Sequence, residues 1–240
     1  MEWTISSFLF ANSILILGSI LQMATGVSMG MIVIPFLAMI SYTLVPIPVI
    51  FGSLPFTIMM AYQGREHIDT KNMLQISIGM LGGIFVAIYL FKNIYFEYLG
   101  ILFGLFILLS VFISIRVKQF KLGWSVNYTG GFLAGLMGSM AAVGGQILAL
   151  LFQNHTLESI KSTLAFLYTV FSLVMLVIFY VFGEFSSEQM ISGLYMVPGF
   201  IIGFFIAPIF TKYFNPKYAK TVVLSMATFG ALVLIGKSII

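Results

Sequence analysis

The chain has 240 residues, of which 60% are hydrophobic and only 8% are charged, and its mean hydropathy is +1.11. Soluble domains carry roughly 25% charged residues, so this composition excludes the soluble classes and is typical of a polytopic membrane protein. The net charge is a modest +4, which does not indicate nucleic-acid binding, and the chain has no cysteine with which to build a disulfide framework.

The charged residues lie in short breaks between long apolar runs. Runs without charge cover residues 8 to 64, 72 to 91, 98 to 115, 122 to 154, 162 to 183, 189 to 211 and 221 to 236. Most of these runs match the roughly 20 residues that a helix needs to cross a bilayer. The sequence therefore predicts an all-α, multi-pass membrane protein.

The first half begins with an apolar segment that small and polar residues interrupt. Its stretch "ATGVSMGMIVIP", residues 24–35, contains two glycines, a threonine and a serine. Three uninterrupted spans follow, near 45 to 63, 72 to 91 and 97 to 115. We expect one broken membrane segment and then three plain transmembrane helices.

The second half repeats this order. Its first segment contains "GLMGSMAAVGGQILALL", residues 135–151, which carries four glycines and a glutamine within a run that is apolar enough to cross a membrane. Plain spans follow near 161 to 182, 189 to 211 and 218 to 237. The second half is therefore also expected to be one broken segment and three helices.

Two pairs of matching stretches support an internal repeat. "GMLGGIFVA" (79–87) and "GFIIGFFIA" (199–207) share Gly, Gly and Ala at the same spacing and lie 120 residues apart. The stretch at 24–35 aligns with "MAAVGGQILALL" (140–151) at an offset of 116. We therefore expect an N-terminal transmembrane repeat at 1–120 and a C-terminal one at 121–240.

Loop charge distinguishes parallel from inverted halves, because Lys and Arg accumulate on the cytoplasmic side. Eight simple spans with parallel halves divide the basic residues six against five. If each broken segment instead enters and leaves on one side, nine basic residues share a side and only Lys92 and Lys237 face the other. The nine are Arg65, Lys71, Arg116, Lys118, Lys121, Lys161, Lys212, Lys217 and Lys220.

This asymmetry favours an inverted topology in which each half contains a re-entrant or half-spanning hairpin and three transmembrane helices. Both termini then lie outside and the basic loops are cytoplasmic. A broken segment of 28 to 33 residues is too short for two full spans but long enough for two half-helices. Inverted repeats with broken helices and a central site recur in transporters. Eight simple spans with parallel halves stay as the alternative.

Three stretches of the chain resemble the sulfite exporter TauE/SafE family. They are "GSILQMATGVSMGMIVIPFL" (18–37), "GGFLAGLMGSMAAVGGQILAL" (130–150) and the loop "QGREHID" (63–69). The resemblance implies export or facilitated passage of small anions such as sulfite or organosulfonates across the cytoplasmic membrane. Ser28, Ala142 and Gln146 depart from the family pattern, which has glycine at the first two positions and commonly proline at the third.

The two broken segments are the expected substrate site. Helices that start near 26–30 and 144–146 would direct free backbone N–H groups and positive dipole ends at an anion, and glycines would let it approach closely. Small polar side chains beside these glycines would add uncharged donors. The predicted binding residues are Gln22, Thr25, Gly26, Ser28, Gly30, Ser139, Gly144, Gly145 and Gln146.

Other small and polar residues receive different expectations. Six glycines are expected to serve close helix packing, as small residues four apart do in lipid, and they are Gly79, Gly83, Gly131, Gly135, Gly199 and Gly203. Ser53 and Thr163 are weaker site candidates. Arg65 is a candidate for gating, although a topology-setting loop charge is the simpler interpretation. The two histidines do not indicate a metal site, and no cofactor is expected.

The placement of the acidic residues bears on mechanism. All seven lie in loops or at span edges, whereas proton-driven transporters usually carry an intramembrane carboxylate or histidine. We therefore expect facilitated anion movement, and an enzyme is not expected because no buried nucleophile with a base is visible. The expected partners are a small anion and the bilayer, with a homo-oligomer left open and no nucleic acid. An anion channel or a membrane subunit of a larger complex is the alternative.

Overall fold

The computed structural model describes residues 3–26, 28–116, 123–213 and 216–239. Within these ranges the chain is helical and has no strand. The helices are α1 (Ile5–Thr25), α2 (Gly30–Ile40), η1 (Tyr42–Leu44), α3 (Ile47–Gly52), α4 (Leu54–Gln63), η2 (Arg65–His67), α5 (Met73–Asn93), η3 (Phe96–Tyr98), α6 (Leu99–Arg116), α7 (Trp124–Ala141), α8 (Gly145–Leu151), α9 (Leu157–Val181), α10 (Ser187–Tyr213) and α11 (Pro216–Ile239). The expected repeat boundary at 120/121, and with it Lys118 and Lys121, lies outside the described residues.

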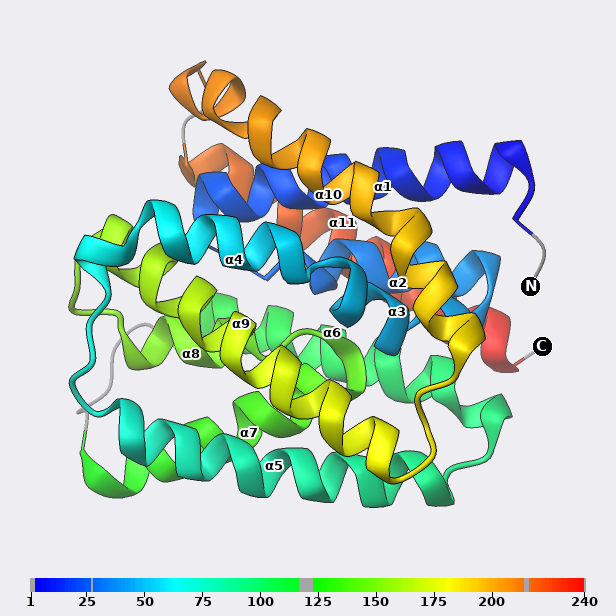
Figure 1. The fold of residues 1–240 in the computed structure, drawn as a ribbon, viewed down its shortest axis with the longest axis horizontal. Coiled ribbons are helices and arrows are strands. Elements are labelled where there is room, and N and C mark those ends of the chain that lie inside the picture. The colour runs from blue at the N-terminus through cyan, green and yellow to red at the C-terminus, as the bar shows by residue number, and fades with distance from the viewer. Residues whose placement is uncertain (1–2, 27, 117–122, 214–215, 240) are drawn as a thin grey trace.

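Seven stretches of the described chain are long and apolar enough to cross a membrane, which confirms a multi-pass, all-helical membrane protein. They are Ile5–Thr25, Tyr42–Gln63, Met73–Asn93, Leu99–Arg116, Leu157–Val181, Ser187–Lys212 and Lys220–Ile239. The long helices run across the molecule in roughly the same direction, and both chain termini lie at the same end (Figure 1).

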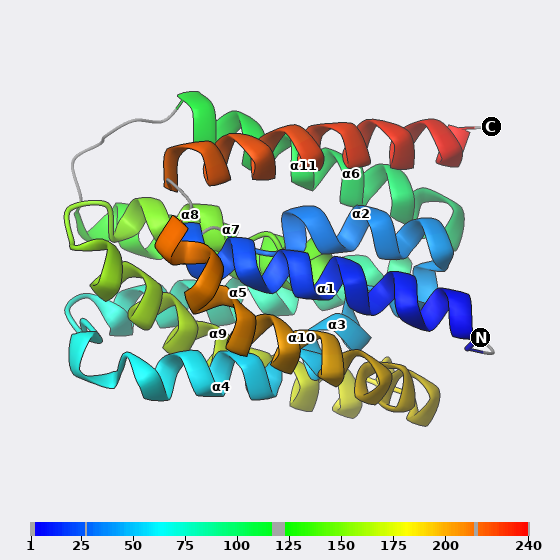
Figure 2. The same ribbon diagram turned by 90° about the horizontal axis from the view of Figure 1, so that it is seen from above.

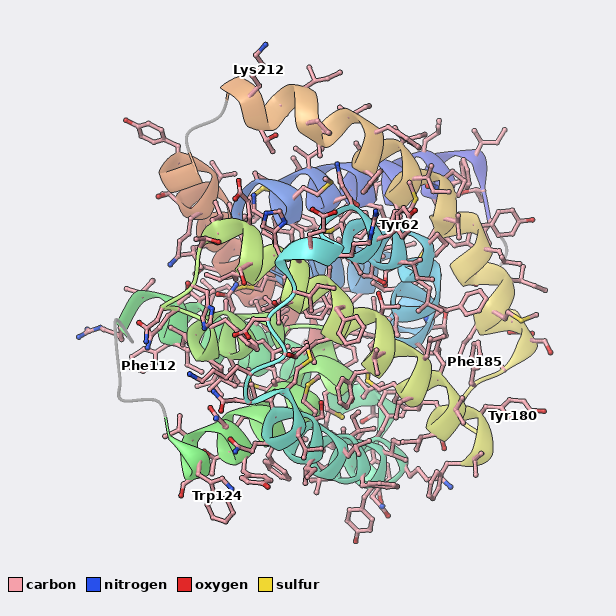
Figure 3. The ribbon with its side chains drawn as sticks, turned by 60° about the vertical axis from the view of Figure 1, so that its left-hand side comes forward. Tyr62, Phe112, Trp124, Tyr180, Phe185 and Lys212 are labelled. Carbon is pink, nitrogen blue, oxygen red and sulfur yellow. The ribbon has the colours of Figure 1, made fainter. Side chains whose placement is uncertain are left out.

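The outer surface is that of a protein solvated by lipid. Large apolar side chains such as Phe112, Phe205 and Val177 are exposed on the flanks of the long helices. Exposed Trp124 and Tyr180 lie near opposite ends of the molecule (Figure 3). Rings with one polar edge are favoured at the two membrane interfaces, so this distribution fits a bundle that crosses the bilayer.

Both broken segments form hairpins of a long and a short helix. The helix α1 runs across most of the molecule, and α2 returns toward the end where α1 began (Figure 2). At that end the indole Nε1 of Trp3 donates to Ser192 Oγ at 3.4 Å, and Lys237 Nζ donates to the carbonyl oxygen of Met39 at 3.0 Å.

The second hairpin is anchored at both of its ends near the start of α5. Asn127 Nδ2, at the start of α7, donates to Gln75 Oε1 at 2.7 Å. After α8, His155 Nε2 lies 3.3 Å from Asp69 Oδ2. The backbone N–H of Asp69 also donates to Thr163 Oγ1 at 2.8 Å, which places the start of α9 at this end.

Two expectations about helix lengths were wrong. The hairpins are not pairs of half-helices, because α1 has 21 residues and α7 has 18, whereas α2 has 11 and α8 has seven. The span expected near 45 to 63 is not plain but consists of η1, α3 and α4. Proline explains this second difference, since Pro46, Pro48 and Pro55 each lack the N–H that a continuous helix requires.

The six spaced glycines do serve helix packing, as expected. A Cβ added at Gly79 or Gly83 would overlap the backbone of α7, and one at Gly131 or Gly135 would overlap the backbone of α5. Gly199 and Gly203 likewise lie against α1. There the backbone N–H of Gly199 donates to Asn12 Oδ1 at 2.6 Å. In lipid such close contact replaces the hydrophobic effect as the force between helices.

Neighbouring glycines on α5 offer a matched test of this packing. Gly83→Ala places a methyl group on the carbonyl oxygen of Phe132, whereas the methyl of Gly82→Ala would lie 3.5 Å from the Phe132 ring, an ordinary contact. Overpacking is therefore expected to lower the thermal unfolding midpoint in detergent for Gly83→Ala by about 5 °C or more, and Gly82→Ala by less than about 2 °C. Equal midpoints would contradict the packing role.

Candidate functional site

The break in the first hairpin arises from a left-handed glycine. Gly26 follows α1 with φ 73°, a conformation that carries little cost for glycine, and its N–H donates to the carbonyl oxygen of Gln22 at 2.8 Å. The chain resumes as α2 at Gly30, so the predicted interruption near 26–30 is present. Gln22 of α1 bridges the interruption, because its Oε1 accepts a hydrogen bond from the N–H of Met29 at 2.9 Å.

The break in the second hairpin occurs at an alanine in the left-handed conformation. Ala142 follows α7 with φ 51°, a left-handed conformation in which a Cβ is strained, and α8 begins at Gly145. The carbonyl oxygen of the next residue, Val143, accepts a hydrogen bond from Ser110 Oγ of α6 at 3.3 Å. Side chains from neighbouring helices therefore satisfy backbone groups at both breaks.

The two breaks lie directly against each other. Ser28 Oγ donates to the carbonyl oxygen of Ala142 at 2.6 Å, and Gln146 Nε2 donates to the sulfur of Met31 at 3.1 Å. Gly30 has to be glycine, since a Cβ there would overlap the Ala142 carbonyl group. Two segments that are over 110 residues apart in sequence thus meet inside the bundle through backbone and short side chains.

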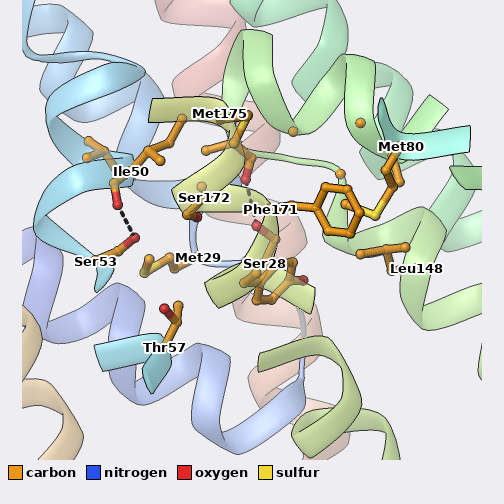
Figure 4. A pocket seen from close by; sticks show the side chains of 18 of the residues that line it. Ser28, Met29, Ile50, Ser53, Thr57, Met80, Leu148, Phe171, Ser172 and Met175 are labelled. Carbon is orange, nitrogen blue, oxygen red and sulfur yellow. Dashed lines mark hydrogen bonds between the residues drawn. The ribbon is translucent and has the colours of Figure 1, made fainter. Parts of the chain in front are cut away.

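A cavity of about 70 Å³ opens beside this contact. It has room for several water molecules or one small ion. Its wall combines both breaks with α3, α4, α5, α7 and α9 (Figure 4). The lining residues with polar side chains are Gln22, Ser28, Ser53, Thr57, Tyr168 and Ser172. None of the lining residues is charged, so every side-chain donor that the cavity offers is neutral.

Four of the nine predicted binding residues line this cavity, namely Gln22, Ser28, Gly30 and Gly144. Gly145 lies next to it, against the hydroxyl group of Tyr168. Because Gln22 uses its oxygen for Met29, its amide nitrogen is left with only a 4.0 Å contact to the sulfur of Met60. That nitrogen is the most available amide donor of the predicted set.

The other predicted residues do not line the cavity. Thr25 Oγ1 donates to the carbonyl oxygen of Leu21 at 2.7 Å, and Gly26 packs against Lys161. Ser139 Oγ donates within α7 to Gly135 at 2.7 Å and also contacts the sulfur of Met175. The remaining two are Gln146, which is buried against Met31, and Arg65, which is exposed and lies over the ring of Tyr62 at 4.6 Å.

Sequence reasoning missed three polar lining residues, which are Thr57, Ser172 and, with the greatest consequence, Tyr168. Its hydroxyl group is buried and has no hydrogen-bond partner among the described residues. Leaving such a group unsatisfied costs about 1 to 3 kcal/mol, so it indicates a missing partner. The signal in the sequence was faint: residues 168, 172 and 175 are spaced for one helix face, but tyrosine in an apolar span is common.

Of the two weaker candidates, Ser53 lines the cavity, where its Oγ donates to the carbonyl oxygen of Ile50 at 2.9 Å (Figure 4). Thr163 instead accepts the N–H of Asp69 at one end of the molecule. At the start of α2 the N–H of Met31 lies 3.4 Å from the carbonyl oxygen of Ser28, and the N–H groups of Ile32 and Val33 donate to the carbonyl oxygen of Met29 at 2.9 Å, so these backbone donors are already used. No group of metal-ligating residues occurs in the described chain.

Comparison with known proteins gives one match. Residues 11–234 match the model of the family described as "Sulfite exporter TauE/SafE", which covers nearly the whole chain. No curated protein and no solved structure matches.

The contact between the breaks can be tested with two glycines. Gly30→Ala is expected to force the breaks apart and to lower the unfolding midpoint by about 5 °C or more, because its methyl group overlaps the Ala142 carbonyl. In Gly138→Ala the methyl group would meet nothing nearer than Gly144 at 3.9 Å, so the midpoint is expected to stay within about 2 °C. Differential scanning fluorimetry in detergent measures both, and a tolerated Gly30→Ala would refute the contact.

Proposed function

The chain belongs to the sulfite exporter TauE/SafE family, and on this premise we propose that it exports small anions, sulfite or organosulfonates, through the cavity between its two breaks. Members of this family are membrane transporters, and the apolar helices of this chain fit that role. The substrate class and the position of the site are the proposed parts.

The unpartnered hydroxyl of Tyr168 carries the proposal. It lies at the cavity beside Gly145, at the start of α8, and the amide nitrogen of Gln22 lines the same space. Both groups can donate hydrogen bonds, and an oxyanion has only acceptors to offer in return. A buried donor without an acceptor is therefore complementary to such a ligand.

The neutrality of the cavity fits transport better than tight binding. A fixed cation deep in the membrane is costly to bury and would hold an anion strongly. Neutral hydroxyl and amide donors bind an anion while still allowing it to leave. The cavity volume of about 70 Å³ suits one small oxyanion or the sulfonate group of a larger molecule.

We further propose that the two halves are inverted, with basic loops in the cytoplasm and both termini outside. Support comes from the ends of the two hairpins. The first hairpin is tied to residues at one end by Trp3 and Met39, and the second is tied to the opposite end by Asn127 and His155. Eight simple spans would separate the two ends of each hairpin across the membrane.

Anion movement down the electrochemical gradient is the mechanism that these residues support. The cavity lining contains no carboxylate or imidazole that would relay a proton. An inside-negative potential alone favours expulsion of an anion by about 2.3 kcal/mol per charge per 100 mV.

Tyr168→Phe is the sharpest test of the site, since it removes only the hydroxyl group. Anions that bind the cavity are expected to stabilise the wild-type protein in detergent, and the variant should bind them about tenfold more weakly. The screen covers sulfite, sulfate, thiosulfate and sulfoacetate. Tyr180→Phe is the matched control, because Tyr180 lies on the same helix and is 72% exposed.

An anion effect that Tyr168→Phe leaves intact would place the site elsewhere. The mechanism is tested with the same protein in liposomes. Efflux of the stabilising anion is expected to follow the imposed membrane potential. A strong response to a pH gradient, at constant potential and constant substrate protonation, would instead indicate proton coupling.

The topology is tested with single cysteines, which the cysteine-free chain allows without background. Glu66→Cys lies in the loop after α4 and Glu188→Cys in the first turn of α10. We expect an impermeant maleimide applied to intact cells to label Glu188→Cys and to reach Glu66→Cys only after permeabilisation. Labelling of both from one face would instead support eight simple spans.

A further inference from the structure

The cavity-lining face of α9 continues to a lysine near the start of the helix. Tyr168, Ser172 and Met175 line the cavity, and Lys161 precedes Tyr168 by seven residues. Seven residues are almost two full turns, so Lys161 lies on the same face about 10 Å away along the helix. No basic residue lines the cavity itself, so Lys161 is a cation on the face that leads into it.

Lys161 packs against the first break rather than extending into the surroundings. Its Cγ would lie 3.4 Å from a Cβ at Gly26, so the side-chain stem crosses the left-handed glycine that ends α1. The residue is half-buried. Lysine stems cover apolar surface readily, so this contact fixes the stem beside the break.

The ammonium group of Lys161 has no hydrogen-bond acceptor and no ion pair among the described residues. Glu158, one turn earlier and exposed, is the acid that attracts it, but the two do not form an ion pair. A half-buried charge without a partner is costly. An anion beside Lys161 would remove that cost.

Lys161 lies at one end of the molecule, near the loop between α4 and α5. Its neighbours Ser162 and Thr163 contact the loop between α4 and α5, where Gly64 lies against Ser162 and Asp69 donates to Thr163. Lys161 therefore lies at the level of this loop, about two turns of α9 before Tyr168. In the proposed topology this end faces the cytoplasm.

We propose that Lys161 forms an outer binding subsite for small oxyanions, which receives the substrate from the cytoplasm before it enters the neutral cavity. This inference rests on the proposed function and adds a recruiting step to it. A charged outer subsite raises the local concentration of anion, and the neutral inner site lets the anion pass on.

The test compares Lys161→Gln and Lys161→Arg with wild type, and Lys220→Gln serves as the matched control. Lys220 is exposed near the start of α11, where its Nζ lies 3.5 Å from the carbonyl oxygen of Ser114. Initial rates of uptake of radiolabelled sulfite and sulfoacetate are measured in inverted vesicles, which present the cytoplasmic face, and in right-side-out vesicles.

For Lys161→Gln we expect KM to rise about tenfold from the cytoplasmic face only, with the maximal rate nearly unchanged. Lys161→Arg should retain a KM near that of wild type, because it keeps the charge. Raising the ionic strength should increase the wild-type KM and leave that of Lys161→Gln unaffected, since screening acts only on the charge. Lys220→Gln should behave as wild type.

Three outcomes would overturn the subsite. They are an unchanged KM in Lys161→Gln, an equal rise in KM from both faces, and a loss of maximal rate that Lys161→Arg shares, which would indicate a structural role. Failure of the proposed function looks different, because wild-type vesicles would then transport neither anion and the subsite would fall with it.

Discussion

Everything at the centre of this protein depends on one constraint: a helix broken inside a membrane must have its free backbone groups covered by protein. Here the two breaks cover each other. The carbonyl oxygen of Ala142 accepts a hydrogen bond from the hydroxyl of Ser28. Gly30, which has no Cβ, allows the two backbones to come into contact. The neighbouring helices complete the cover, with Gln22 accepting from Met29 and Ser110 donating to Val143. The cavity can exist only because this contact holds the breaks side by side.

Most polar groups in the interior are neutral. Methionine sulfur accepts contacts there for which water or a charged group would be the acceptor elsewhere. Gln146 Nε2 donates to the sulfur of Met31, and Ser139 Oγ, which donates to Gly135, lies against the sulfur of Met175. These bonds are weak acceptor contacts. They nevertheless leave those two donors occupied, whereas Tyr168 has no partner among the described residues. Among the polar residues that line the cavity, Tyr168 is the one whose buried hydroxyl lacks a partner in the described chain.

The first spans after the two hairpins are built differently. After the second hairpin this span is the continuous α9, whereas after the first hairpin it is the proline-broken stretch of η1, α3 and α4, which contributes Ser53 and Thr57 to the cavity wall. Among the described residues, α9 supplies the aromatic hydroxyl of Tyr168 to the lining and packs Lys161 against the first break. The cavity between these two unequal walls is neutral. In our proposal, the charged Lys161 lies on its cytoplasmic side.

The sequence by itself determined the membrane class, the helical spans and the places where helices stop. Apolar runs of one bilayer length dictate spans, and the clusters around Gly26 and Gly144 disrupt a helix wherever the chain goes. It also indicated the packing glycines, because their four-residue spacing is a local property of a helix face. The three prolines after α2 are also a local signal of the break in the span that follows it, because proline lacks the N–H that a continuous helix needs.

Only the tertiary structure decided which polar groups face the cavity. Local pattern could not tell Gln22, whose nitrogen is available, from Gln146, whose nitrogen is occupied by Met31. Nor could it place Tyr168 and Lys161 beside the breaks, because these contacts join segments more than 20 residues apart through rotations that each helix adopts only when packed. The burial of a side chain and its hydrogen-bond partners depend on residues from elsewhere in the chain. The spacing of residues within one helix carries no information about those contacts.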